Sequence, residues 1–266
     1  MSIEKNNLVI LKIGGSVITD KKNNKKTINQ KVIKRITKEI AQAKNKKNFS
    51  LIIIHGVGTF GHKIAKNFDL QNGYKNRSQI RAISSLCLDL KRLNIEILKH
   101  LKKENVNAVT FEQSSAWKMT NGRLCNCNLS IINQYLKLNL TPVLYGDILI
   151  DNKLKFSILS GDQIIYYLAK KLNADKVIMG TDIDGVFDCD PKINKNAKLI
   201  KLVNKNNFNK LSLSGSTAVD VTDGMKGKVN ELMNLSKFKI KSKIINLTKP
   251  NILKYTLLGK NYFGTT

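Results

Sequence analysis

The sequence predicts an α/β fold whose central sheet is mainly parallel. Strand-like and helix-like runs alternate along the 266 residues, which is the pattern of strands joined by crossover helices. The strand-like runs are short, apolar and rich in β-branched residues, as are strands that helices cover on both faces. With 42% hydrophobic residues, the chain can form one large domain or two lobes that share a sheet.

Six short apolar runs are the predicted strands: Leu8–Ile13, Leu51–Ile54, Ala108–Phe111, Pro142–Tyr145, Lys176–Met179 and Lys243–Leu247. Apolar residues at helical spacing predict helices between them: Gln30–Lys44, Ile80–Leu98, Ser130–Leu138, Asp162–Leu172 and Met225–Leu235.

Three further features complete this outline. The apolar face of the predicted helix Ile80–Leu98 is interrupted once, at Asn94. The stretch Ile148–Ile158, with Asp151-Asn152 at its centre, predicts a hairpin. The polar, turn-rich stretch Gly185–Lys201 predicts a surface loop.

The formal net charge of +27 is compatible with a nucleic-acid or anionic membrane partner. However, only five of the 46 basic residues are arginine, the side chain best suited to bidentate contacts with phosphate and guanine. The lysines are spread along the chain among many asparagines, without a basic stripe that carries aromatic residues. A bias toward Lys and Asn explains the charge better than a specific nucleic-acid function, and nonspecific binding at low salt stays open.

No apolar run approaches the length of a membrane span, and the first residues lack the apolar segment of a signal peptide. We therefore expect a cytoplasmic protein that has no membrane partner. The four cysteines and three histidines do not have the spacing of zinc ligands, so no metal-ligating side chains are predicted.

The first Gly-rich turn, Gly14-Gly15-Ser16, ends the strand that carries Lys12. A lysine inside an apolar strand needs a partner, and glycines let backbone N–H groups approach a ligand closely. Together with Lys21, this turn suits the phosphates of a nucleotide. An ordinary turn at the end of a strand explains the segment alone equally well.

The second turn, from His55 to His62, follows the second predicted strand and opens a helix. Free N–H groups and the positive end of a helix dipole favour an anion at such a junction. The His62 imidazole can donate to that anion, or it can be a half-buried histidine in a tight turn. The surrounding glycines favour the first interpretation.

Three further turns carry charged side chains at strand–helix junctions or strand ends. In Ser160-Gly161-Asp162, the carboxylate can cap the next helix or hold nearby lysine ammonium groups. Thr181-Asp182-Ile183-Asp184-Gly185 is either a nucleotide or metal contact or a common turn. In the segment from Asp220 to Lys228, Gly224 allows close approach and lysines can reach a phosphate. Because no nucleophile–base pair accompanies these turns, the set favours phosphoryl transfer.

The order of these motifs resembles the amino acid kinase superfamily, from Leu8 to about Lys228. Within it, the sequence is similar to the isopentenyl phosphate kinase family. The segments that carry this similarity are the one from Gly14 to Lys21 and Phe60-Gly61-His62, because members that act on carboxylates are not expected to have this histidine.

This resemblance implies one amino acid kinase domain, an open αβα sandwich over residues 1–266. An N-terminal lobe at about 1–172 would bind the phosphate acceptor, and a C-terminal lobe at about 173–266 would bind ATP. The implied reaction transfers the γ-phosphoryl group of ATP, with Mg²⁺, to isopentenyl phosphate. A homodimer formed through the N-terminal lobe is also implied.

The resemblance also assigns roles to residues. Lys21 would stabilise the transition state, and Asp162 would organise the lysines. The acceptor side would comprise Val57, His62 and Gly161. The nucleotide side would comprise Lys12, Ile13, Gly14, Gly15, Ser16, Gly58, Asp182, Gly224 and Lys228.

Two positions depart from the family pattern, which usually has glycine where this chain has Val57 and Asp223. Val57 either displaces the acceptor or presents its N–H unchanged if its φ angle is negative. Asp223 would repel ATP phosphates unless it points away or meets Lys226 or Mg²⁺. The alternatives to the implied reaction are a kinase of another small phosphate or phosphonate and, from another class, a basic nucleic-acid-binding protein on a kinase fold.

Overall fold

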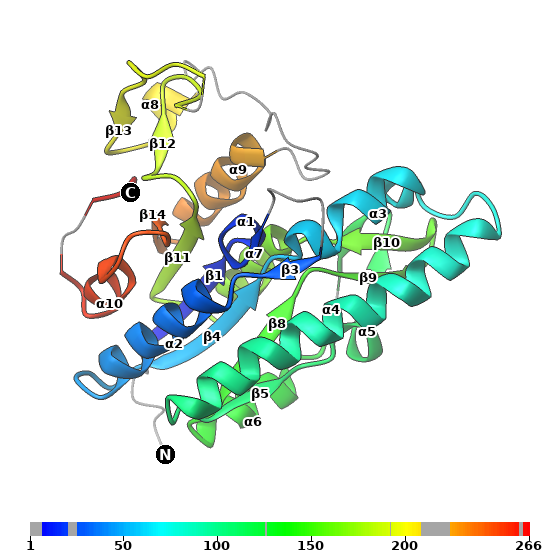
Figure 1. Cartoon of the computed structure of the whole chain (residues 1–266), viewed down its shortest axis with the longest axis horizontal. Helices are drawn as coiled ribbons and strands as arrows, with labels where there is room; N and C mark the ends of the chain where they lie inside the picture. The colour runs from blue at the N-terminus through cyan, green and yellow to red at the C-terminus, as the bar shows by residue number, and fades with distance from the viewer. Residues whose placement is uncertain (1–6, 21–25, 126, 192, 209–223, 261–262) are drawn as a thin grey trace.

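In a computed structural model, the described residues are 7–20, 26–125, 127–191, 193–208, 224–260 and 263–266. Their main feature is a six-stranded sheet with the order β14-β11-β1-β4-β8-β5 (Figure 1). Every pairing in this sheet is parallel. Its strands are β1 (Leu8–Ile13), β4 (Ser50–His55), β5 (Ala108–Thr110), β8 (Thr141–Tyr145), β11 (Lys176–Thr181) and β14 (Lys241–Asn246).

Helices cover both faces of the sheet, because alternate strand residues are apolar on both sides. In β1, Val9 and Leu11 belong to one hydrophobic core, whereas Leu8 and Ile10 belong to the other. The first core includes helices α2 (Gln30–Lys44), α4 (Ser78–Lys103) and α10 (Ile252–Leu257). The second includes α6 (Ser130–Lys137), α7 (Gly161–Lys171) and α9 (Gly224–Ser236). The predicted αβα sandwich is confirmed.

The long helix α4 differs near its start from the predicted helix, whose apolar face began at Ile80. Its buried stripe includes Ala82, Leu86 and Leu90, whereas Ile80 is 55% exposed. The interruption at Asn94 is buried, and its side chain bonds to His55 and Thr110. The polar residue is therefore tolerated because it has hydrogen-bond partners inside the core.

Smaller elements extend from this sandwich. The predicted hairpin is confirmed as β9 (Asp147–Asp151) and β10 (Lys155–Leu159), in a sheet with β6 (Met119–Thr120) and β7 (Arg123–Leu124). The predicted surface loop Gly185–Lys201 instead contains two short paired strands, β12 (Val186–Phe187) and β13 (Leu199–Ile200). Strand β2 (Thr19–Asp20) pairs in antiparallel fashion with β3 (Thr27–Ile28). The remaining short helices are α1 (Gly15–Ile18), η1 (Gly58–Phe60), α3 (His62–Asn67), η2 (Leu70–Asn72), α5 (Gln113–Ala116) and α8 (Lys205–Phe208).

Over the described residues, no helix has the length and apolar character that a membrane crossing requires.

Candidate active site

Two Gly-rich turns meet at the carboxyl edge of the sheet, because β1 and β4 are parallel neighbours with Ile13 paired to His55. The turns touch backbone to backbone. A Cβ atom on Gly15 would lie 2.2 Å from the Gly58 nitrogen, and one on Gly56 would lie 2.5 Å from the Gly15 nitrogen. Glycine is therefore required at both positions, and the two turns form one surface.

The Thr19 side chain links the two Gly-rich turns by hydrogen bonds. Its hydroxyl donates to the Gly15 carbonyl at 2.8 Å and accepts from the Thr59 N–H at 3.1 Å. Gly58, which precedes Thr59 in the second turn, has a φ angle of +50°, a backbone conformation that favours glycine. Backbone amides from two strands are thus held in a fixed arrangement at this edge.

Lys12 and Lys228 converge on the carboxylate of Asp162. Lys12 Nζ pairs with Asp162 Oδ1, and Lys228 Nζ lies 3.7 Å from Asp162 Oδ2. The Lys12 and Asp162 side chains are only 8% and 6% exposed, so each charge depends on the other. This geometry agrees with the expectation that Asp162 organises the lysines.

Gly161 makes room for this ion pair, since a Cβ atom there would lie 3.3 Å from Lys12 Cε. The residue that caps α7 is Ser160, whose side chain accepts from the Gln163 N–H at 3.2 Å. The alternative in which Asp162 is the cap is therefore wrong, although Asp162 lies in the first turn of the helix, where the dipole favours its charge.

Asp182 meets the first Gly-rich turn from the end of β11. Its Oδ1 accepts from the Ser16 hydroxyl at 3.0 Å, and the Gly14 N–H donates to the Gly180 carbonyl at 2.9 Å. The predicted nucleotide-side residues from Lys12 to Ser16 therefore share one edge with Asp182.

Val57 has a φ angle of −89° and precedes the helical turn η1. Its side chain lies over two glycines: a Cβ atom on Gly61 would be 2.4 Å from Val57 Cγ2, and one on Gly146 would be 3.2 Å from Cγ1. The negative φ angle means that valine is accommodated without backbone strain. His62, which is half-buried, begins α3 next to this turn.

Two of the positions singled out in the sequence are not described by the structure, and two others share one helix. Lys21 and Asp223 lie outside the described residues. Gly224 is the first residue of α9, and Lys228 lies one turn further along the same helix.

A buried polar cluster beside the acceptor side was missed in the sequence. Asp147 is 4% exposed, and burial raises its pKa to about 6. Gln113 Nε2 donates to Asp147 Oδ2 at 3.2 Å and to the Tyr145 carbonyl at 2.9 Å. The His55 ring stacks on Tyr145 with centroids 5.2 Å apart, and burial lowers the pKa of His55 to about 4. The available signal was an aspartate two residues after a buried strand, in Tyr145-Gly146-Asp147.

No group of three or more His, Cys, Asp or Glu side chains that could hold a metal ion occurs in the described part of the chain.

A family model described as the amino acid kinase family matches residues 7–246, which include the whole six-stranded sheet and both Gly-rich turns. The chain belongs to the amino acid kinase family. The sequence motifs indicated this membership, and the match confirms it.

Relatives within the amino acid kinase family differ in how much of their length is similar to this chain. The isopentenyl phosphate kinase of Methanothermobacter thermautotrophicus is 35% identical, over 97% of this chain and 98% of its own length. That of Methanocaldococcus jannaschii is 37% identical, over 95% and 96%. A glutamate 5-kinase from Clostridium tetani is 28% identical over only 52% of each chain.

Solved structures of isopentenyl phosphate kinases are similar to this chain over nearly its whole length. X-ray structures of isopentenyl phosphate kinase include one with a TM-score of 0.84 and 33% identity, covering 97% of this chain and 99% of that chain. A product complex of the T. acidophilum isopentenyl phosphate kinase gives 0.75 at 26% identity, covering 97% and 98%. The resemblance to isopentenyl phosphate kinases is therefore confirmed over the full fold.

Proposed function

We propose that this chain transfers the γ-phosphoryl group of ATP directly to isopentenyl phosphate, which yields isopentenyl diphosphate and ADP. The observation that carries the proposal is the convergence of Lys12 and Lys228 on Asp162 beside two Gly-rich turns. Full-length similarity to isopentenyl phosphate kinases supports this acceptor over a carboxylate.

Phosphoryl transfer to a phosphate acceptor requires charge neutralisation more than proton transfer. A phosphate monoester is already ionised near neutral pH, so its attacking oxygen needs no general base. The barrier lies in bringing two polyanions together in line, which fixed cations and backbone N–H groups make easier. Lys12 and Lys228 are the described ammonium groups that we assign to this task, and Asp162 keeps both in place.

We assign donor and acceptor to opposite sides of the joined turns. The amides from Ile13 to Ser16, with Gly58, Asp182, Gly224 and Lys228, would hold the ATP phosphates. Val57 N–H, His62 and the amide of Gly161 at the start of α7 would hold the acceptor phosphate. In this scheme Lys21 stabilises the transferred group.

Two features of the acceptor side support a phosphate ligand. The half-buried His62 begins a helix, where the dipole favours an anion. Its imidazole would select a tetrahedral phosphate over a planar carboxylate by hydrogen bonding. The isoprenoid tail would lie toward α4, which would form a wall of the pocket in addition to packing in the first core.

Mg²⁺ is proposed as part of the donor. The ion usually keeps several waters and binds through substrate phosphates with one or two carboxylates, which fits a described chain without a three-residue metal cluster. Asp182, which lies beside the first Gly-rich turn, is the carboxylate that would help to hold the ion. When bound, it would neutralise charge on the transferred group.

The lobes and the assembly are also proposals. We assign acceptor binding to residues 1–172 and most of ATP binding to residues 173–266. We propose a cytoplasmic homodimer formed through the N-terminal lobe. Exposed apolar residues on α4, Ile80, Leu88 and Ile95, support this face.

The deciding experiment is ADP release from Mg-ATP by the purified chain. Isopentenyl phosphate is compared with dimethylallyl phosphate, fosfomycin and glutamate as acceptors. Turnover on isopentenyl phosphate, alone or with dimethylallyl phosphate, supports the proposal. Activity only on fosfomycin would reassign the pocket to another small phosphonate kinase, and activity on none would overturn the proposal.

A further inference from the structure

We infer that Asn246 and Lys249 are positioning residues for the nucleotide, acting through Asp184 in the turn from Thr181 to Gly185. This inference rests on the proposed function only in that the bound nucleotide is ATP. Neither residue belongs to the five turns that the sequence motifs marked: Asn246 is the last residue of β14, and Lys249 follows three residues later.

The contact begins at the carboxylate of Asp184. Asn246 Nδ2 donates to its Oδ1 at 3.0 Å, and Lys249 Nζ donates to its Oδ2 at 2.7 Å. Burial alone would raise the pKa of Asp184, but the hydrogen bonds from Lys249 and Asn246 lower it below its ordinary value. The ionised carboxylate is therefore matched to two donors from one segment.

Asp184 is only two residues from Asp182, whose Oδ1 accepts the Ser16 hydroxyl on the first Gly-rich turn. Thr181 stiffens the same turn, because its hydroxyl donates to the Ile183 carbonyl at 2.8 Å. The Leu247 N–H also donates to the Thr181 carbonyl at 2.9 Å. Asp184 is thus held from the β14 side, while Asp182 faces the phosphate turn.

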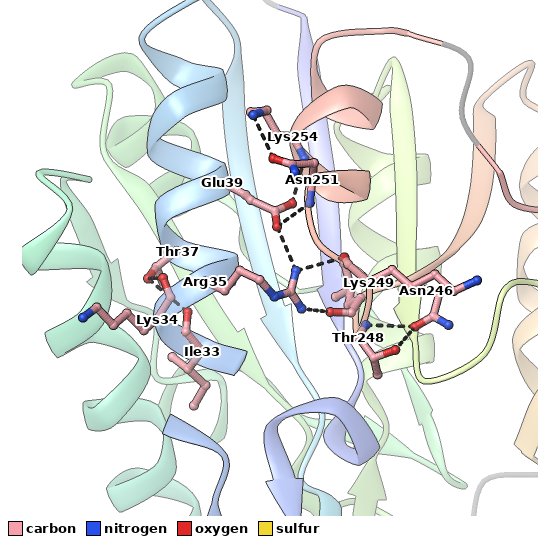
Figure 2. Close-up of polar contacts among 11 residues, drawn as sticks. Ile33, Lys34, Arg35, Thr37, Glu39, Asn246, Thr248, Lys249, Asn251 and Lys254 are labelled. Carbon is pink, nitrogen blue, oxygen red and sulfur yellow. Dashed lines mark hydrogen bonds and ion pairs between the residues drawn. The ribbon is translucent and has the colours of Figure 1, made fainter. Parts of the chain in front are cut away.

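The segment that supplies these donors is itself clamped by α2 (Figure 2). Arg35 donates to the Leu247 carbonyl and, at 3.0 Å, to the Lys249 carbonyl. Glu39 accepts from the Asn251 N–H at 2.9 Å and from the Lys254 N–H at 3.2 Å. One helix therefore binds both the carbonyls and the amides of the turn after β14.

Arg35 and Glu39 form an ion pair at 2.8 Å, and the Glu39 side chain is only 5% exposed. A buried carboxylate is unfavourable unless it is paired and hydrogen-bonded, and here its partners are a guanidinium and two backbone N–H groups. Within the turn, Asn246 Oδ1 also accepts from the N–H of Thr248 at 2.8 Å and from its hydroxyl at 2.6 Å. The turn therefore has little freedom to move Asn246 or Lys249 away from Asp184.

The test compares Lys249→Ala with Lys254→Ala as a matched control. Lys254 contacts the Asn251 side chain and the Tyr255 ring, and its ammonium does not contact Asp184. Kinetics give kcat and the KM for each substrate, and calorimetry gives the dissociation constant for ATP without acceptor. We expect Lys249→Ala to weaken ATP binding by between about twofold and thirtyfold, with the KM for isopentenyl phosphate unchanged.

A second set of variants separates positioning from general stability. Lys249→Arg is expected to restore most of the ATP affinity, because it keeps a cationic donor. Asp184→Asn is expected to weaken ATP binding as Lys249→Ala does, and the double variant to be no weaker than either single one, since both remove the same interaction.

Equal effects of Lys249→Ala and Lys254→Ala would overturn the inference, as would additive effects in the double variant. An equal rise in both KM values would also overturn it. Because calorimetry needs no acceptor, an inactive wild-type chain that binds ATP refutes the proposed acceptor while leaving this inference under test.

Discussion

Lys12 and Asp162 are separated by 150 positions in the sequence, yet they form a buried ion pair between the first strand and the start of α7. The pair joins the edge that carries the first Gly-rich turn to the junction that we assign to the acceptor. Because Lys228 also approaches Asp162, one carboxylate sets the position of two cations. Loss of this ion pair is therefore expected to affect both the stability of the fold and the proposed phosphoryl transfer.

Asp162→Asn is expected to lower both stability and turnover. The substitution keeps the shape of the side chain but leaves the buried Lys12 ammonium without its counter-charge. Breaking such a pair typically reduces the free energy of unfolding by about 3–5 kcal/mol, and we expect kcat to fall about a hundredfold or more. Urea denaturation and ADP release measure the two effects. Asp69→Asn, which removes an exposed ion pair with Lys75, is the control; an unchanged kcat in Asp162→Asn contradicts the assignment.

His62→Ala is expected to reduce turnover by about a hundredfold or more, since it removes one hydrogen bond that we assign to the acceptor phosphate. ATP affinity, measured by calorimetry, should stay the same. His100→Ala serves as the control, because His100 lies on α4 and contacts Gln30. Full activity in His62→Ala would reject this residue as an acceptor ligand.

Gly61→Ala is expected to destabilise the chain by about 1–3 kcal/mol, because the new Cβ atom would overlap Val57 Cγ2. The Gly61 backbone has a φ angle of −114°, which alanine accepts, so the effect comes from the overlap alone. The double variant Val57→Gly/Gly61→Ala should recover most of that loss. Thermal denaturation measures both; the same loss in the double variant would show that Val57 is not the obstacle.

Asp147 and His55 are expected to have opposite effects on stability between pH 4 and 6. Burial raises the pKa of Asp147 to about 6, so the folded chain keeps a proton that the unfolded chain has lost, and unfolding becomes easier as the pH rises. Burial lowers the pKa of His55 to about 4, so unfolding becomes easier as the pH falls below its ordinary range.

Asp147→Asn removes the first of these effects. Relative to the wild type, its free energy of unfolding should increase as the pH rises from 4 to 6, by on the order of 2 kcal/mol. Urea denaturation at several pH values gives this difference. A difference that does not change with pH would mean that Asp147 does not titrate in that window.

Leu88→Lys combined with Ile95→Lys is expected to convert the proposed dimer to a monomer. These side chains are 53% and 49% exposed and lie on one side of α4. Sedimentation velocity of the two proteins measures the change. Ile193→Lys, at an exposed apolar residue in the other lobe, should leave the assembly unchanged. A wild-type monomer, or a variant that stays dimeric, would refute this interface.

Local sequence patterns were sufficient to predict the strands of the sheet and most of the turns at its carboxyl edge. The helix Gln30–Lys44 begins and ends as predicted, because its apolar stripe and its Asn29 cap agree. The two Gly-rich turns follow the strands after which they were predicted, and they meet because the carboxyl ends of parallel strands share one edge. The hypothesis that Asp162 holds lysines needed only charge and spacing.

Other features depend on contacts between distant segments. Ile80 fits an apolar stripe in sequence, but in the fold it is 55% exposed, whereas Ala82 and Leu86 are buried. The short helix α10 was missed because six residues carry too little periodicity, and its start is fixed by Glu39, which is 212 positions away from Asn251. Lys249 resembles any surface lysine until the fold places it beside Asp184.

The contact of Gly15 with Gly56 and Gly58 has a practical consequence for protein engineering. No side chain separates the two turns, so no repacking can absorb a change at either glycine. A library that aims at new acceptors should therefore keep Gly15, Gly56 and Gly58 and vary Val57, Gly61 and Gly146 together, where side-chain atoms form the contact. Recombination between relatives should likewise exchange the two turns as one block.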